Sequence, residues 1–169
     1  MPPKTIDIEK YHQLALQRQA EHRKFLAALK KKPPKHLDKI VQAIHQEVFQ
    51  GIDCTACANC CKDLGPDLTE TDIVKIAKLF QMTLATFEKT YLRVDEDGDK
   101  VFQSLPCPFL GGDNLCSIYD VRPKACREFP HTDRKKIYQI NHLLTLKNTL
   151  ICPAAYEFVE RLSKRLARS

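Results

Sequence analysis

Apolar residues recur every three or four positions through the first fifty residues. From Asp7 to Lys32 the stripe runs through Tyr11, Leu14, Ala15, Phe25, Leu26 and Leu29. Residues 36–50 repeat the pattern after Pro33-Pro34, a pair that ends a helix. We therefore predict an N-terminal helical segment of two helices over residues 1–50. The first helix either packs on the core, which we favour because few such stripes are exposed in monomers, or docks a protein partner.

In the middle of the chain, the spacing of apolar residues changes from helical to alternating. Thr69, followed three positions later by Asp72, is a variant capping box that predicts the start of a helix. Thr83 predicts the cap of a second, shorter helix. Residues 92–103 alternate around an acidic turn at 95–99, which predicts a two-stranded hairpin. The turn lacks the full ligand set of a calcium loop, so we interpret it as a solvated hairpin tip.

The last third of the chain predicts short helices beside prolines. Arg122-Pro123 predicts a short helical turn that presents Cys126, and residues 137–150 predict a further helix. Pro153 stands in the favoured first position of a final helix that extends to about residue 167. The fold class expected from these elements is mainly α with a small β-hairpin, in a single compact domain.

Composition indicates the class of protein and the compartment in which it works. The 169 residues are 43% hydrophobic and 28% charged, as in ordinary soluble domains. No apolar run suggests an export signal or a membrane span, so we expect a cytoplasmic protein with reduced thiols. If the chain were exported, its eight cysteines could instead form four disulfides. The formal charge of +6 is weak evidence for any partner, because metal-bound thiolates would offset most of it.

The cysteines carry the candidate chemistry. Four stand within eight residues, and four more follow one at a time beside turns or prolines. Sulfurs spaced two residues apart in a tight turn can be directed at one ion or cluster. We predict that the later set completes the coordination begun by the first, so that the metal ligands are Cys54, Cys57, Cys60, Cys61, Cys107, Cys116, Cys126 and Cys152. Adjacent side chains point apart, so Cys60 and Cys61 should serve two centres, or one should be a ligand and the other its neighbour.

The spacing favours an iron–sulfur cluster over Zn²⁺ without deciding between them. Cys54, Cys57 and Cys60 have the gaps of a ferredoxin-type loop, in which a distant Cys-Pro supplies the fourth ligand. Cys107-Pro108 and Cys152-Pro153 are both available for that part. A zinc ribbon would use a second pair of cysteines two apart, which this chain lacks. A redox pair is an alternative, formed by Cys57 and Cys60 or by Cys60 and Cys61. It would leave most of the thiols unexplained.

Side chains near Cys126 could surround the centre and tune it. An arginine can neutralise or hydrogen-bond a thiolate-rich centre. Alternatively, the arginines pair at the surface with Asp120 and Glu128. The candidates for this outer layer are Tyr119, Arg122, Arg127 and Phe129.

The combined cysteine pattern resembles the YkgJ-type cysteine-cluster family, described as a proposed zinc- or iron-chelating domain. The resemblance rests on Cys54-x2-Cys57-x2-Cys60-Cys61, Cys107-x-Phe-Leu, Cys116-x-Ile-Tyr, Arg122-Pro, Cys126-Arg-x-Phe-Pro and Cys152-Pro. It covers roughly residues 50 to 155, so we place a cysteine-cluster metal-binding domain at 51–169. The resemblance implies that the eight cysteines chelate metal. The same domain occurs in flagellin lysine N-methylases, which suggests an enzyme.

Three hypotheses for function follow. The first is a cytosolic metal-binding protein with a structural, metal-handling or redox role. The second is an enzyme that uses the centre, such as a protein methyltransferase, but no glycine-rich cofactor loop and no catalytic residues apart from the cysteines are recognisable. The third is a metal-stabilised RNA- or protein-binding module. It is based on Lys30 to Lys32 and on Arg161, Lys164, Arg165 and Arg168, and it is the weakest because no base-stacking aromatics accompany these charges.

Overall fold

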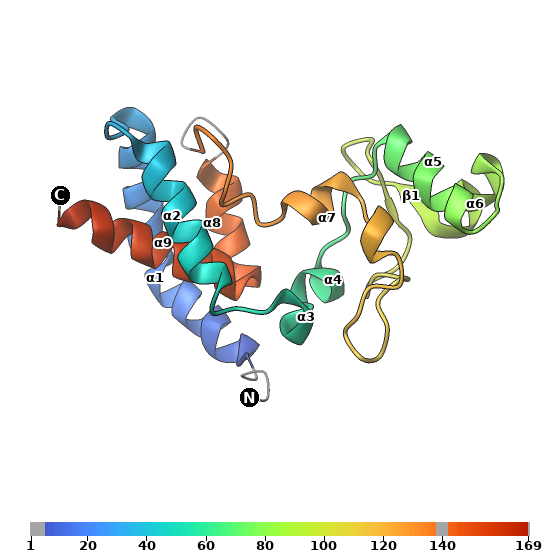
Figure 1. The fold of residues 1–169 in the computed structure, drawn as a ribbon, viewed down its shortest axis with the longest axis horizontal. Helices are drawn as coiled ribbons and strands as arrows, with labels where there is room; N and C mark the ends of the chain where they lie inside the picture. The colour runs from blue at the N-terminus through green and yellow to red at the C-terminus, as the bar shows by residue number, and fades with distance from the viewer. Residues whose placement is uncertain (1–5, 138–141, 169) are drawn as a thin grey trace. The chain divides into compact units, whose positions relative to one another are not determined.

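The structure, a computed structural model, describes residues 6–137 and 142–168. Where the sequence predicted a single compact domain, the contacts of the chain cluster into two compact units (Figure 1). Unit 1 comprises Met1–Cys57 and Pro130–Ser169, and unit 2 comprises Ala58–Phe129. The reason is topological, because the C-terminal helices pack on the N-terminal helices and leave the middle of the chain to build its own core. The proposed boundary at residues 50 and 51 stays a prediction.

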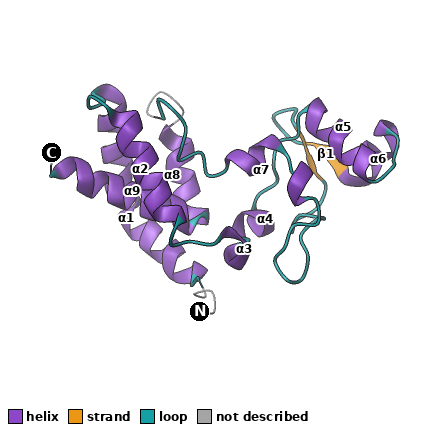
Figure 2. Cartoon of the chain, viewed as in Figure 1, coloured by secondary structure: helices purple, strands orange, loops and turns teal. Residues whose placement is uncertain are grey.

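Unit 1 is built from helices (Figure 2). Its elements are α1 (Ile8–Lys31), α2 (Leu37–Phe49), α3 (Cys54–Cys57), α8 (His142–Ile151) and α9 (Pro153–Ala167). Helix α1 packs against α8 and α9, and α2 packs against α9. Of the predicted amphipathic stripe of α1, Ala15, Leu26 and Leu29 are buried within unit 1, and the other three residues are half-buried. As expected, Pro153 occupies the first turn of α9. The helix predicted from residue 137 is described from His142 onward, and residues 138–141 of that prediction lie outside the described residues.

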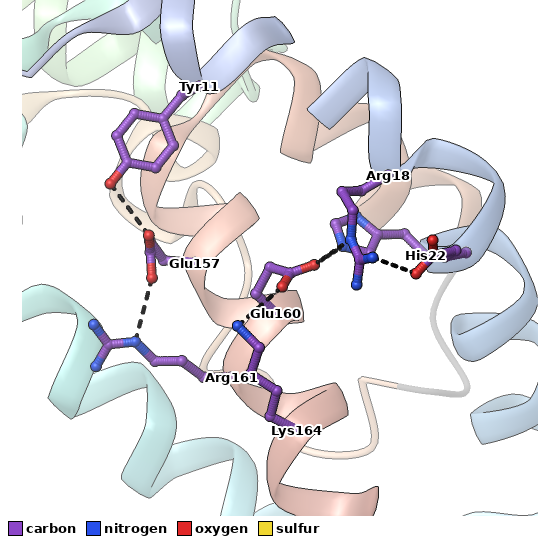
Figure 3. A network of polar contacts seen from close by, with 8 residues as sticks. Tyr11, Arg18, His22, Glu157, Glu160, Arg161 and Lys164 are labelled. Carbon is purple, nitrogen blue, oxygen red and sulfur yellow. Dashed lines mark hydrogen bonds and ion pairs between the residues drawn. The ribbon is translucent and has the colours of Figure 1, made fainter. Parts of the chain in front are cut away.

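Polar contacts also join α1 to α9 (Figure 3). The buried carboxylate of Glu160 contacts His22 Nε2 at 2.8 Å and accepts a 3.0 Å hydrogen bond from Arg18 Nε. One turn earlier on α9, Glu157 accepts a hydrogen bond from the Tyr11 hydroxyl at 3.2 Å. A network of charged side chains thus lies along one edge of the apolar contact between α1 and α9.

Unit 2 combines short helices with a hairpin. Its elements are α4 (Asn59–Asp63), α5 (Glu70–Leu79), α6 (Leu84–Tyr91), β1 (Leu92–Val94), β2 (Lys100–Phe102), the 3-10 helix η1 (Tyr119–Val121) and α7 (Lys124–Glu128). The predicted capping box is confirmed, because Thr69 and Asp72 exchange backbone and side-chain hydrogen bonds at the start of α5. Thr83 caps α6, also as predicted.

The hairpin forms in the expected place. Strands β1 and β2 are antiparallel, with Leu92 opposite Phe102 and Val94 opposite Lys100. Buried apolar residues of the hairpin, α5 and α6 form the core of unit 2, and Cys107 and Cys116 pack against this core. The fold class is therefore mainly helical with one small hairpin. Across residues 6–137 and 142–168, no helix combines the length and the apolar character that spanning a bilayer demands.

Candidate metal centre

The cysteine-rich stretch folds as two short helical segments, where the sequence analysis predicted only a tight turn. Helix α3 begins after Asp53, whose carboxylate accepts hydrogen bonds from the Thr55 amide at 2.9 Å and the Thr55 hydroxyl at 2.7 Å. Ala58 follows in the left-handed region (φ 49°) and precedes α4. The signal for α3 was present in the sequence, since an Asp two residues before a Thr favours a local turn.

Cys60 and Cys61 are consecutive residues of α4, and their thiols interact directly. The Cys60 thiol donates a hydrogen bond to the Cys61 sulfur, which is the main reason that the pKa of Cys61 is lowered to about 7. Burial opposes this shift and the positive charge of Lys62 assists it. Cys61 is therefore the member of the adjacent pair whose thiolate is stabilised.

Cys107 lies beside Cys61 because their backbones are hydrogen-bonded. The amide of Cys107 donates to the carbonyl oxygen of Cys61 at 2.8 Å. The loop that follows closes through an antiparallel bridge between Leu110 and Cys116 and a 2.8 Å hydrogen bond from the Gly111 amide to the Leu115 carbonyl. This closure brings Cys116 back toward Cys107.

Backbone amides hydrogen-bond to three of the later sulfurs. The Cys107 sulfur accepts from the amides two and three residues on, at Phe109 and Leu110. The Cys116 sulfur accepts from Ile118, two residues on. Cys152 repeats the arrangement with the two helical amides that follow Pro153. Such donors stabilise thiolate over thiol and are a recurrent feature around metal-bound sulfur. Sequence reasoning did not predict these bonds.

Cys126 is carried by α7, which is tied to α5. The Lys124 amide donates a 3.1 Å hydrogen bond to the buried carboxylate of Asp72. Burial is the largest effect on Cys126, and the nearby charges of Cys61, Cys107 and Cys116 add to it, so that the pKa of Cys126 is raised to about 12. Four of the five thiols of unit 2 thus lie within one another's electrostatic reach, and we call them the quartet: Cys61, Cys107, Cys116 and Cys126.

Unit 1 gathers a second, smaller set of thiols. Cys152 caps α9 and packs against the core of unit 1. Burial again has the largest effect and outweighs the amide hydrogen bonds, and the charges of Cys54 and Cys57 act in the same direction as burial, so that the pKa of Cys152 is raised to about 12. We call Cys54, Cys57 and Cys152 the trio. Cys152, one of the two Cys-Pro candidates, lies near Cys54 and Cys57.

The arginine next to α7 lies close to the quartet. The Arg122 guanidinium stacks over the Tyr119 ring, 3.8 Å from its centroid, and donates to the Tyr119 carbonyl at 2.7 Å. Its charge opposes the burial that raises the pKa of Cys116 and of Cys126. Arg127 donates to the Arg122 carbonyl and so braces this loop. A contact from the Phe129 side chain stays a prediction.

The sulfur positions within each unit can be compared with those of the ligands of one small ion. Tetrahedral zinc with Zn–S bonds of about 2.3 Å places its sulfurs roughly 3.8 Å apart. Within either unit of the described chain, no three cysteine sulfurs lie within 4.8 Å of one another, whereas the carboxylates of Asp67, Asp95 and Asp99 do. Asp95 uses its carboxylate to accept the amides of Asp97 and Asp99, which explains the acidic group as part of the hairpin turn.

The donor chemistry fits a positively charged inorganic group. Several partly buried thiols within one another's electrostatic reach cannot all ionise unless a cation balances them. The quartet and the trio both show this condition in the raised pKa values of their buried members. Backbone amides and the Arg122 guanidinium lie beside the sulfurs that would become negatively charged. Such a site can therefore hold zinc or iron.

Comparison with known protein families gives an independent result. The model named "CxxCxxCC: Putative zinc- or iron-chelating domain" matches residues 53–152, more than half of the chain. The matched range begins next to Cys54 and ends on Cys152, so it contains the quartet, the trio and Cys60. No curated protein and no solved structure matches the chain.

Proposed function

Since the chain belongs to the CxxCxxCC family of zinc- or iron-chelating domains, we propose that it is a metal-binding protein whose eight cysteines hold iron, as an iron–sulfur cluster, in preference to zinc. The observation that carries the proposal is the gathering of the quartet. Four thiols from α4, the 107–116 loop and α7 lie within one another's electrostatic reach, and none is more than partly exposed. These thiols can all become thiolates only if something cationic compensates their charge.

The cysteine spacing in the sequence favours iron–sulfur over a single zinc ion. The two-residue spacing of Cys54, Cys57 and Cys60 with a distant Cys-Pro is typical of ferredoxin-type loops.

The residues around the sulfurs would orient and tune the bound group. The amides of Phe109, Leu110 and Ile118 would hydrogen-bond the coordinating sulfurs, and Arg122 would offset part of their negative charge. Both effects are known to shift the reduction potential and stability of sulfur-ligated centres. When bound, an iron–sulfur cluster would supply one-electron chemistry or a structural cross-link between distant parts of the chain.

The experiment is elemental analysis and a visible absorption spectrum on protein purified without oxygen. We expect iron and acid-labile sulfide in similar amounts, with broad visible absorption that bleaches on reduction. Stoichiometric zinc with a featureless visible spectrum would mean that the bound group is zinc and not an iron–sulfur cluster. Folded protein that contains neither metal, with quartet thiols that react rapidly, would overturn the proposal.

A further inference from the structure

We propose that the last two turns of α9, together with the end of α2, bind the phosphate groups of a small molecule. The site is an open hollow of about 300 Å³ in unit 1, hereafter the basic hollow. Its lining residues are Glu47, Arg161, Lys164, Arg165 and Arg168. The hollow uses none of the cysteines, so this proposal stands or falls independently of the proposed metal-binding function.

Helical spacing places the four cations of the hollow side by side. Arg161 and Arg165 are one turn apart on α9, and so are Lys164 and its C-cap Arg168. Residues three and four apart are neighbours on a helix surface. Helix α2 packs against α9 and contributes Glu47 from its last turn. The two walls of the hollow are held by the apolar core that both helices share.

Positive charge predominates in the basic hollow. Of the five described residues that line it, four are cationic and Glu47 is the one carboxylate. Like charges one helical turn apart repel each other, and a bound anion would relieve that repulsion. Glu157 and Glu160 pair with Arg161 and Lys164, but both carboxylates also bind side chains of α1 (Figure 3). Their charges thus also serve the contact between α1 and α9.

One arginine of the hollow already binds an oxyanion. The two carboxylate oxygens of Glu47 lie 3.1 and 3.2 Å from Arg165 Nη2. The Arg165 side chain is 49% exposed and that of Glu47 is 43% exposed, and ion pairs this exposed add little stability. A phosphate group carries more charge and more acceptor oxygens than a carboxylate. It can therefore take the place of Glu47 against this guanidinium.

The lining selects a compact phosphorylated ligand. Three of the four cations are arginines, whose planar N–H groups match the oxygens of a phosphate. The volume is at the lower end of the range for small-molecule sites, about 300–1,000 Å³. None of the five described lining residues has an aromatic ring on which a base could stack. The hollow thus fits the phosphates of a small molecule better than a single strand of RNA.

The test measures pyrophosphate binding to the full chain, purified without oxygen, by isothermal titration calorimetry at physiological ionic strength. Arg165→Ala and Arg168→Ala should each weaken binding roughly tenfold or more. Arg165→Lys should also weaken binding, because it keeps the charge but loses the planar N–H groups. The matched control is Arg23→Ala, which removes an exposed cation of α1 and should change affinity less than about twofold. Chelation of metal by pyrophosphate would affect all of these proteins alike, so the differences between them report on the hollow.

A variant with the opposite expected sign separates the site from general loss of structure. Glu47→Gln removes the competing carboxylate and should tighten pyrophosphate binding roughly two- to fivefold, whereas Glu9→Gln, an exposed control on α1, should not. Absence of pyrophosphate binding, or equal weakening in Arg23→Ala, would overturn the site. Tighter binding of an oligouridine strand or of phosphatidylserine vesicles than of pyrophosphate, lost in the same arginine variants, would assign the surface to nucleic acid or membrane and overturn the small-molecule proposal.

Discussion

The amide of Cys107 donates a 2.8 Å hydrogen bond to the carbonyl oxygen of Cys61. This bond joins the end of the cysteine-rich stretch to the start of the second series of cysteines. Because it uses only main-chain atoms, it places the two sulfurs near each other whatever their protonation or ligation. The candidate centre is therefore partly organised by the backbone before any metal binds.

Replacing Cys126 by serine should remove metal and destabilise the protein. A serine hydroxyl is a poor ligand for zinc or iron, and the three remaining quartet thiols would lose their compensating charge. We expect loss of the quartet metal and a fall in the free energy of unfolding of about 2 kcal/mol or more. Elemental analysis and urea denaturation would measure both. The matched control is Ala125→Ser, which puts the same hydroxyl on the same helical turn, and an equal effect of the two substitutions would contradict the ligand role of Cys126.

Substitution of Asp72 should lower stability and metal retention by more than the loss of a helix cap explains. Thr83→Ala removes only a cap, from α6, and should cost about 1 kcal/mol of stability. Asp72→Ala removes the capping box of α5 and also leaves the Lys124 amide without its acceptor, which should cost about 1–3 kcal/mol more. It should also weaken metal retention, because the turn that carries Cys126 is released. Metal content after dialysis against a chelator would separate the two variants, and equal retention would show that the Asp72–Lys124 contact does not support the site.

The sequence predicts the parts of this fold whose causes are local. Thr69 and Thr83 fulfil their capping roles, Pro153 begins α9, and the acidic turn closes the hairpin, because each outcome depends on residues a few positions apart. The two helical turns around Ala58 were not predicted, since four- and five-residue helices show too little periodicity to recognise and only α3 has a local turn signal, at Asp53 and Thr55.

The candidate ligands follow from the sequence, but their arrangement in space does not. Cysteine spacing identifies the candidate ligands. It does not indicate that Cys107 lies beside Cys61 or that Cys152 lies near Cys54 and Cys57. Contacts such as that between Asp72 and Lys124 depend on how distant elements pack, and no local pattern encodes them.

Glu160 should make the stability of the protein depend on acidic pH. Burial alone would raise the pKa of this carboxylate, but hydrogen bonds from His22, Arg18 and Lys164 outweigh it and lower the pKa to about 2 (Figure 3). A depressed folded-state pKa contributes stability above the unfolded value of 4.5, and this contribution is lost as the pH falls toward 2. Glu160→Gln should therefore cost on the order of 1–3 kcal/mol at pH 7 and much less near pH 2.

Denaturant unfolding of metal-free protein across this pH range would measure the effect. Glu157→Gln, one turn earlier on α9, is the matched control. Its longer and more exposed contacts with Tyr11 and Arg161 should be worth less than about 1 kcal/mol. A cost of Glu160→Gln that does not change with pH would show that ionisation of this carboxylate is not what stabilises the contact between α1 and α9.

Metal binding to the quartet should release protons. Burial is the largest effect that raises the pKa of Cys107, Cys116 and Cys126, so these thiols carry protons at pH 7 in the metal-free protein, while Cys61, with a pKa of about 7, is partly ionised. Thiolate is the form that binds metal, so loading must displace three to four protons, and affinity must rise with pH. Lowering the pH by one unit should weaken zinc binding on the order of 10³-fold.

Calorimetric titration with zinc alone, in buffers that differ in ionisation enthalpy, counts the protons directly. Cys107→Ser/Cys126→Ser should release about two fewer protons than the unmodified chain. A net release near zero would mean that the thiolates already exist without metal, stabilised by the amides and Arg122 alone.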